Sequence, residues 1–315
     1  MHRRRFLSAL AAAAAGVRLR GQAPPAKSKG LRLSITCDMF RGEAIRLPID
    51  TPGKRDPRPG PRRKYTPDEA LALTREQGYQ AFELFDWRDP GEWSGYSAAK
   101  EKYALECACI EANKGVRAPG CGLTNPAERE EFLTVLAGAI ETGKKIGTRM
   151  LVVLTGLERE GVSRTEQMDS CVAGLRAAAP VLEKAGMTAI VEPVNTRVTR
   201  PGYFLPSVRE GLAMLRRVDS ANVKLLFDIY HAQISDGDLI PQIRDHIALI
   251  GHFHIGDHPG RMQPGSGEIN YRNVLRAIYE LQQSGRFEGY CALEYHPSVS
   301  LPRTMAEVRR LANFE

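Results

Sequence analysis

Residues 150–154 read MLVVL, an unbroken apolar run in a chain of 315 residues. A strand with one face in solvent alternates apolar and polar side chains. An unbroken run therefore predicts a strand that is buried on both faces, as in a parallel sheet. Seven other segments have a similar apolar character. The expected strands are residues 32–37, 81–85, 105–110, 150–155, 188–192, 223–228, 247–254 and 290–295.

Helical patterns separate these segments. Asn, Asp or Ser with a nearby Pro stands at several helix starts, and Gly stands at several ends, as helix termini favour. The expected helices are residues 67–78, 125–147, 163–186, 206–218, 271–284 and 302–312. Segment 105–110 is ambiguous, because it could instead extend a helix before it.

Eight strand–helix units over about 285 residues predict a closed (β/α)8 barrel, also called a TIM barrel. An open, doubly wound sheet is the alternative, but it usually has a Gly-rich turn after its first strand. Residues 37–40 read CDMF, which is not such a turn. We therefore expect one α/β barrel domain over residues 31–315, preceded by a linker over residues 24–30.

The first residues resemble an export signal. RRRFL at residues 3–7 is similar to a twin-arginine motif, and an Ala-rich run over residues 9–16 follows it. Residues 1–23 therefore predict a signal peptide and a periplasmic location. Twin-arginine export carries folded proteins, which would suit an enzyme that binds a metal. A disordered basic tail is the alternative. No apolar run reaches the ~18 residues of a membrane span, so we expect none.

The charge distribution argues against a nucleic-acid partner. The formal net charge is +7, but five positive charges and no negative one fall within residues 1–23, which leaves +2 on the rest of the chain. A second basic cluster, residues 54–64, contains three prolines and a glycine and predicts an exposed loop. This loop could also attract anionic substrates. The six cysteines lack zinc-ribbon spacing, so buried free thiols are expected, although an oxidising compartment would permit disulfides.

Polar residues end the last four expected strands. They are Glu192, Asp228, His254 and Glu294, separated by 36, 26 and 40 residues. Each separation is about one βα unit of ~30 residues, and neighbouring barrel strands end at one mouth. Three carboxylates and one imidazole suit Mn2+, Mg2+ or Co2+. Each residue alone could be a cap or a core hydrogen-bonding group, but four such groups together would be costly to bury unpaired.

Several stretches resemble the hydroxypyruvate isomerase family. They are EPVNTR at 192–197, PGYFL at 201–205, FDIYHAQ at 227–233, GDL at 237–239 and PGRMQPGSGEINY at 259–271. The wider group of xylose isomerase-like barrels includes the tagatose and psicose 3-epimerases. The resemblance covers residues from about 140 to 298 and is weak before them.

The resemblance implies roles for individual residues. The family's metal ligands correspond to Glu192, Asp228, His254 and Glu294. Its proton-transfer groups correspond to Glu192 and Glu294, and its substrate contacts to His231 and Arg261. His231 could instead be a structural group beside the site. Many hydroxypyruvate isomerases have Gln where this chain has His254, whereas the 3-epimerases have His, so isomerase and epimerase both stay open.

The implied chemistry requires these residue types. A divalent cation bound to the substrate stabilises the enediolate that forms when a C–H proton beside a carbonyl is removed. A carboxylate takes and returns the proton. Return to the neighbouring carbon isomerises, and return to the same carbon from the other face epimerises. The expected substrate is a small sugar or a hydroxy-keto acid. The planar guanidinium group of Arg261 would suit a carboxylate or phosphate on that substrate.

Two further residues lie on expected strands. Glu83 could be a metal ligand or could form a salt bridge inside the barrel. His252 shares a strand face with His254, one layer below it, and is expected to be a packing residue.

Two other functions are considered. An endonuclease IV-like metal nuclease shares this barrel but uses histidines from early strands, and this chain has no histidine between residues 3 and 230. A non-catalytic exported sugar-binding protein would have no need of two glutamates and a histidine at the mouth. The oligomeric state is left open, a homo-oligomer included.

The twin-arginine interpretation makes a direct prediction. Replacing Arg3 and Arg4 together with Lys should trap the precursor in the cytoplasm, because the motif requires the arginine pair. Cell fractionation with immunoblotting measures the distribution. Mature protein in the periplasm at full yield would rule out this export route.

Overall fold

The computed structural model describes residues 30–42, 64–113 and 122–314. The expected signal peptide, the expected linker except residue 30, the basic cluster except Lys64, and Cys121 lie outside these residues. The five cysteines in the described ranges are all buried free thiols, as expected. No helix in these ranges is long and apolar enough to span a membrane.

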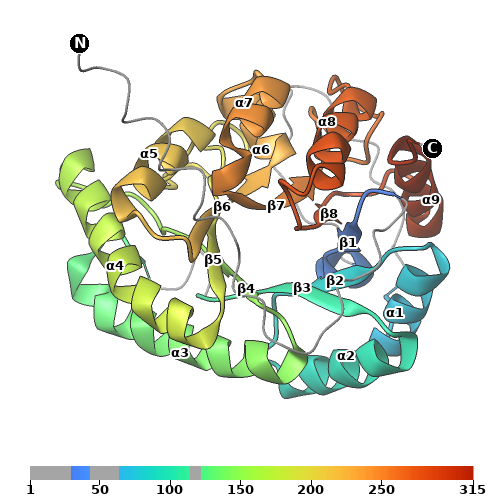
Figure 1. The fold of residues 1–315 in the computed structure, drawn as a ribbon, viewed down its shortest axis with the longest axis horizontal. Coiled ribbons are helices and arrows are strands. Elements are labelled where there is room, and N and C mark those ends of the chain that lie inside the picture. The colour runs from blue at the N-terminus through green and yellow to red at the C-terminus, as the bar shows by residue number, and fades with distance from the viewer. Residues whose placement is uncertain (1–29, 43–63, 114–121, 315) are drawn as a thin grey trace, which may run out of the picture.

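Eight parallel strands form the barrel at the centre of the molecule (Figure 1). They are β1 Leu33–Ile35, β2 Ala81–Leu84, β3 Glu106–Glu111, β4 Met150–Val153, β5 Thr188–Val191, β6 Val223–Asp228, β7 Ile250–Ile255 and β8 Cys291–Leu293. Each strand from β2 to β8 pairs with its predecessor or successor in the chain, and β1 pairs with β8. A single parallel bridge from Thr36 to Glu83 joins the two remaining edges. The eight expected strands and the (β/α)8 fold are confirmed.

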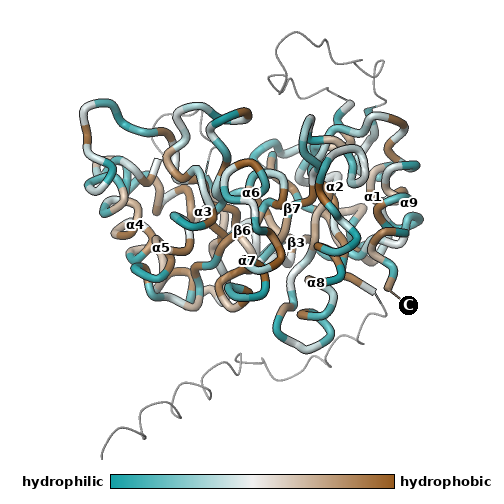
Figure 2. The backbone as a smooth tube through the Cα atoms, turned by 90° about the horizontal axis from the view of Figure 1, so that it is seen from above, coloured by the Kyte–Doolittle hydropathy of each residue, from teal (hydrophilic) through white to brown (hydrophobic). Residues whose placement is uncertain are grey.

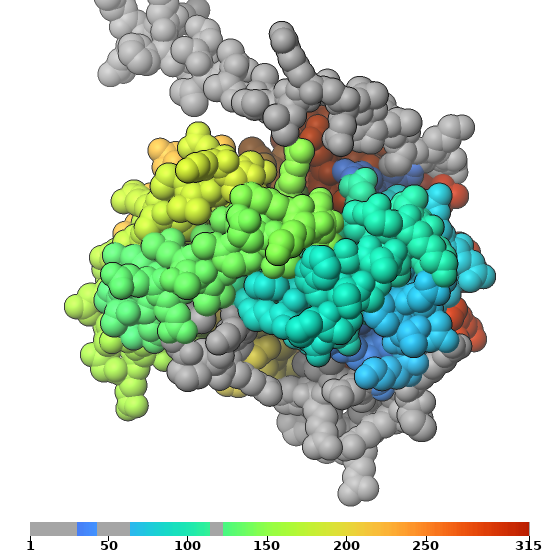
Figure 3. Space-filling model, turned by 90° about the horizontal axis from the view of Figure 1, so that it is seen from below, coloured from blue at the N-terminus to red at the C-terminus, as the bar shows by residue number. Residues whose placement is uncertain are grey.

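Helices surround the strands (Figure 1). They are α1 Pro67–Glu76, α2 Pro90–Tyr103, α3 Arg129–Ile146, α4 Arg164–Ala185, α5 Val208–Val218, α6 Ile229–Ser235, α7 Leu239–His246, α8 Tyr271–Gln283 and α9 Leu301–Leu311. Short 3-10 helices occur at η1 Cys37–Phe40, η2 Pro126–Glu128 and η3 Ile247–Leu249. Figure 3 shows the early helices lying side by side over one face of the molecule.

The six expected helices are present, and the structure adds α2, α6 and α7. Helix α2 has no clear apolar period, and only Tyr96 and Ala99 along it are buried. It ends at Ala104, whose φ of 50° is left-handed and breaks the helix. The ambiguous segment after it is therefore a strand, β3, and does not extend α2.

The core has an outer layer between strands and helices and a smaller layer inside the barrel. The hydropathy-coloured backbone in Figure 2 shows apolar segments inside and polar segments on the periphery. Phe253 of β7 points outward, with its ring 5.7 Å from Phe227 and 5.0 Å from Phe287. Because neighbouring residues of a strand point to opposite faces, His252 and His254 point into the barrel.

Two glycines that precede strands differ sharply in their surroundings. A Cβ atom on Gly289 would lie 2.3 Å from the backbone oxygen of Gly251 and 2.6 Å from the Phe287 ring. A Cβ atom on Gly30 would have no neighbour within 4 Å. The close approach of β7 to the segment before β8 therefore requires glycine at position 289.

This contrast predicts unequal costs. Gly289→Ala should destabilise the protein by about 1–3 kcal/mol, the usual cost of overpacking, while Gly30→Ala should leave stability nearly unchanged. Urea denaturation followed by circular dichroism measures both variants. Equal unfolding midpoints would contradict the close packing of β7 against this segment.

Candidate active site

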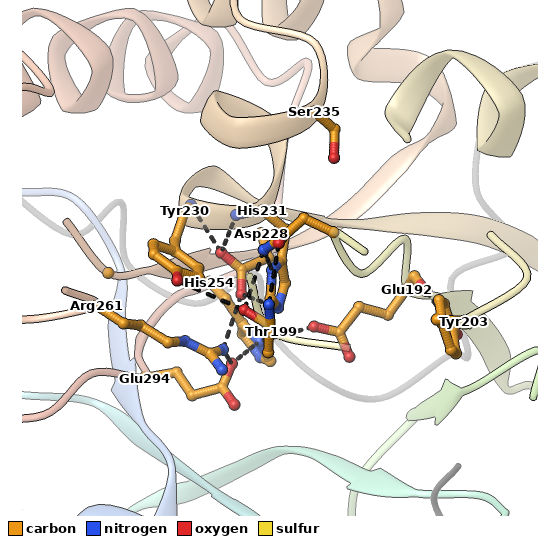
Figure 4. Close-up of polar contacts among 12 residues, drawn as sticks. Glu192, Thr199, Tyr203, Asp228, Tyr230, His231, Ser235, His254, Arg261 and Glu294 are labelled. Carbon is orange, nitrogen blue, oxygen red and sulfur yellow. Dashed lines mark hydrogen bonds and ion pairs between the residues drawn. The ribbon is translucent and has the colours of Figure 1, made fainter. Parts of the chain in front are cut away.

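The four residues predicted as metal ligands come from four neighbouring strands. Asp228 is the last residue of β6, His254 lies near the end of β7, and Glu192 and Glu294 directly follow β5 and β8. The sheet register aligns them, because Asp228 pairs with His254 and His254 pairs with Ala292. The barrel thus brings all four side chains to its C-terminal mouth (Figure 4).

The side chains converge tightly. One ligand atom from each of the four residues lies within 4.8 Å of the others. His254 Nδ1 lies 2.7 Å from Glu294 Oε2 and 3.8 Å from Glu192 Oε1. In Figure 4 the two glutamates approach His254 from opposite sides. Asp228 and His254 are almost fully buried, whereas the Glu294 side chain keeps 21% of its surface exposed.

The two carboxylate oxygens of Asp228 have different partners, one in a helix cap and one in the site. Its Oδ1 atom caps α6, accepting hydrogen bonds from the backbone N–H of Tyr230 at 2.8 Å and of His231 at 3.3 Å. Its Oδ2 atom accepts from Arg261 Nη2 at 3.0 Å. The helix cap therefore fixes the direction in which Oδ2 points.

Arg261, predicted as a substrate contact, lies directly against the ligand group. The same Nη2 atom is 2.7 Å from Glu294 Oε2. Arg261 is buried and has a left-handed backbone φ of 49°. Asp257 shapes its loop by accepting hydrogen bonds from the backbone N–H groups of Gly265, Gly267 and Ile269. A cationic side chain in a strained, braced loop indicates a functional position.

The crowded carboxylates perturb one another. Burial, with the nearby charge of Glu294, raises the pKa of Glu192 to about 8. Burial also opposes ionisation of Glu294, but Arg261 and His254 outweigh it and lower the pKa of Glu294. Burial and Glu294 thus favour the neutral form of Glu192, while Glu294 is ionised beside Arg261 and His254.

The donor set fits a divalent cation. His254 Nδ1 and Glu294 Oε2 are buried, and neither has a partner in hydrogen-bonding geometry among the described residues. These two atoms, beside two more carboxylates, form a donor set that matches the oxygen-rich coordination of Mn2+ or Mg2+. A dication held here would also favour the ionised form of Glu192, because a nearby opposite charge lowers the pKa of a carboxyl group.

Glu83 and His252 form a second polar group behind His254. Glu83 is fully buried, with Oε1 2.5 Å from His252 Nε2 and Oε2 3.1 Å from His254 Nε2. Burial raises the pKa of Glu83, but the two imidazoles outweigh this and lower it to about 2. These three residues are also near enough to hold an ion. The 2.5 Å contact is, however, a hydrogen-bond distance that leaves no room for an ion between its atoms.

The expectation that His252 only packs is therefore wrong. Its ring does face the barrel below His254, but it hydrogen-bonds a carboxylate. The sequence could not show this, because the two partners are separated by 169 residues.

His231 reaches the same site from α6. Its Nε2 atom lies 3.5 Å from Asp228 Oδ2, and its Nδ1 atom lies 2.6 Å from Asn195 Nδ2. Burial lowers the pKa of His231 to about 4. Asn195 belongs to the EPVNTR stretch, but its role is not evident without the fold.

Tyr203 supports the segment that carries Glu192. Its hydroxyl donates to the backbone oxygen of Glu192 at 2.9 Å and accepts from the backbone N–H of Thr155 at 3.0 Å. This side chain therefore links the ends of β4 and β5. It lies in the PGYFL stretch, where sequence reasoning assigned it no function.

Comparisons with known proteins agree with the barrel fold and identify a family. A family model described as xylose isomerase-like TIM barrel matches residues 71–313. A putative hydroxypyruvate isomerase of Danio rerio is 32% identical over 249 residues, 77% of this chain and 88% of that protein. The hydroxypyruvate isomerase of Escherichia coli is 32% identical over 175 residues, 56% of this chain and 66% of that protein.

A solved structure shows the same architecture. The D-allulose 3-epimerase from Methylomonas sp. superposes with a TM-score of 0.63 at 20% sequence identity, covering 91% of this chain and 96% of that one. At this identity the likeness concerns the fold.

The chain belongs to the xylose isomerase-like TIM barrel family. The relatives described above carry the names of isomerases, and the structural neighbours include ketose epimerases. The chain is an enzyme of this isomerase or epimerase class.

Proposed function

We propose that the protein is a metal-dependent isomerase that moves a carbonyl between adjacent carbons of a small hydroxy-keto acid or sugar. The observation that carries the proposal is the placement of Glu192 and Glu294 around the Nδ1 atom of His254, with Asp228 completing the group. The similarity to hydroxypyruvate isomerases supports the substrate class. Ketose 3-epimerisation on the same site is the second candidate, favoured by histidine at position 254.

Each polar side chain has a part in this chemistry. Glu192, Asp228, His254 and Glu294 would hold the cation. When bound, the cation polarises the substrate carbonyl and stabilises the enediolate. The two glutamates, one on each side, are placed to remove and return the substrate proton.

Arg261 and His231 would orient the substrate. Arg261 Nε makes no hydrogen bond among the described residues, and in this proposal it would donate to a substrate oxygen. Its planar fork suits a carboxylate better than a lone hydroxyl. This geometry supports a keto acid over a neutral ketose.

A substrate panel tests the proposal. The protein loaded with Mn2+, Mg2+ or Co2+ should convert hydroxypyruvate or a small ketose such as D-allulose, and EDTA should abolish turnover until metal is restored. Chromatography of products, with solvent deuterium incorporation, gives the readout. Turnover that resists exhaustive chelation would contradict the metal role. Binding without conversion would favour a sugar-binding protein.

The paired glutamates make a second prediction. Glu192→Gln and Glu294→Gln keep the side-chain shape but remove the base, so each should lower turnover by at least ~100-fold. The exposed Glu141→Gln, remote on α3 and paired with Lys144, serves as the matched control.

Proton exchange separates the two reaction types. A one-base isomerase should retain solvent exchange of the substrate proton in one glutamine variant, whereas an epimerase should exchange from one face in each. Near-wild-type rates in both variants would show that these glutamates are structural.

A further inference from the structure

We propose that Asn195 is a positioning residue that holds the ring proton of His231 on Nε2, so that His231 donates a hydrogen bond to a substrate oxygen. This inference rests on the proposed function for the identity of the acceptor. The proton position itself follows from the contacts around Asn195.

The orientation of the Asn195 amide is determined by its neighbours. Its Oδ1 atom accepts hydrogen bonds from the backbone N–H of Val198 at 3.0 Å and of Thr199 at 3.2 Å. Backbone N–H groups can only donate, so oxygen and not nitrogen must occupy this position. The NH2 group consequently faces His231 Nδ1 at 2.6 Å and Thr199 Oγ1 at 3.1 Å.

The amide in turn determines the tautomer of His231. Because Asn195 Nδ2 donates to Nδ1, the Nδ1 atom must present its lone pair. An imidazole with an unprotonated Nδ1 carries its proton on Nε2. That Nε2–H lies 3.5 Å from Asp228 Oδ2, the carboxylate oxygen that faces the ligand group.

His254 shows the opposite arrangement in the same site. Its outer nitrogen, Nε2, faces Glu83 Oε2 at 3.1 Å, and a carboxylate with a lowered pKa can only accept. His254 therefore carries a proton on Nε2, which makes Nδ1, the nitrogen that faces Glu192 and Glu294, the atom that would ligate a cation. Asn195 donates to the outer nitrogen of His231, so the inner nitrogen of His231 carries the proton and can donate. Glu83 accepts from the outer nitrogen of His254, so the inner nitrogen of His254 is the one available as a ligand.

Asn195→Asp isolates this effect from the support of the loop. The substituted side chain keeps an oxygen for the N–H groups of Val198 and Thr199. It places a second acceptor oxygen against His231 Nδ1, which then requires a proton. Asn222→Asp is the matched control, because Asn222 Nδ2 donates to the Met187 backbone oxygen at 2.8 Å, before the start of β6 at the other end of the barrel.

Nitrogen NMR reads the proton position directly. Two-bond 1H–15N spectra of the labelled full-length protein in Mg2+ buffer report each ring nitrogen, and the His231 signals are those absent from His231→Gln. We expect an unprotonated Nδ1 in the wild type and in Asn222→Asp, and a protonated Nδ1 in Asn195→Asp. A protonated Nδ1 in the wild type, or an unchanged His231 in Asn195→Asp, would overturn the inference.

Kinetics test whether the proton position matters for turnover. Asn195→Asp should lower kcat about tenfold, the size expected for one lost hydrogen bond, and less than about threefold in the His231→Gln background, where no tautomer exists. Equal losses in both backgrounds would show that Asn195 acts independently of His231 and would overturn the positioning role. A wild-type protein inactive on every substrate would refute the proposed function, while the NMR result would still decide the tautomer.

Discussion

The crowding of three carboxyl groups at the mouth of the barrel is the constraint on which the rest of the site depends. Glu192, Asp228 and Glu294 lie within a few ångströms of one another in a largely buried setting. Buried charges of one sign are costly unless they are paired. Arg261 pairs with two of these groups, Asp228 and Glu294, from a backbone position with a left-handed φ.

Buried polar partners also lie behind the two histidines of the site. Behind His254, in the interior of the barrel, the carboxylate of Glu83 forms hydrogen bonds with the imidazole nitrogens of His252 and His254. Behind His231, a fully hydrogen-bonded asparagine plays the corresponding part. Both partners are buried, so their contacts are not weakened by solvent. The barrel thus supplies a rigid polar shell, and not only a set of reacting groups.

Much of the fold could be predicted because its signals are local. Apolar runs, several of them nearly continuous like MLVVL, predicted seven strands and left segment 105–110 ambiguous, and caps with Pro or Gly predicted six helices. Helix α2 was missed because its sequence is mostly polar and buries few side chains. Helix α6 was missed because it begins directly after β6 without a separate start signal.

Only part of the site could be predicted from the sequence. Strand-end residues could be recognised from their spacing, whereas the partners behind them could not. Glu83 meets its histidines across about half the length of the chain, and the effect of Asn195 depends on which of its two amide atoms faces the ring. These contacts of Glu83 and Asn195 can be identified only from the folded structure.

The junction between β6 and α6 has a consequence for how this protein could diverge. Asp228 ends the strand and caps the helix that begins at the next residue, so no insertion is possible there without detaching the Oδ2 atom from the site. The long connections after β5 and β7, residues 192–207 and 256–270, carry Glu192, Asn195 and Arg261 and are restricted at these positions, but they have room for change between them. Relatives with new substrate preferences should therefore keep the spacing of the Asp-to-helix junction and differ at those loop positions that do not support Glu192, Asn195 or Arg261.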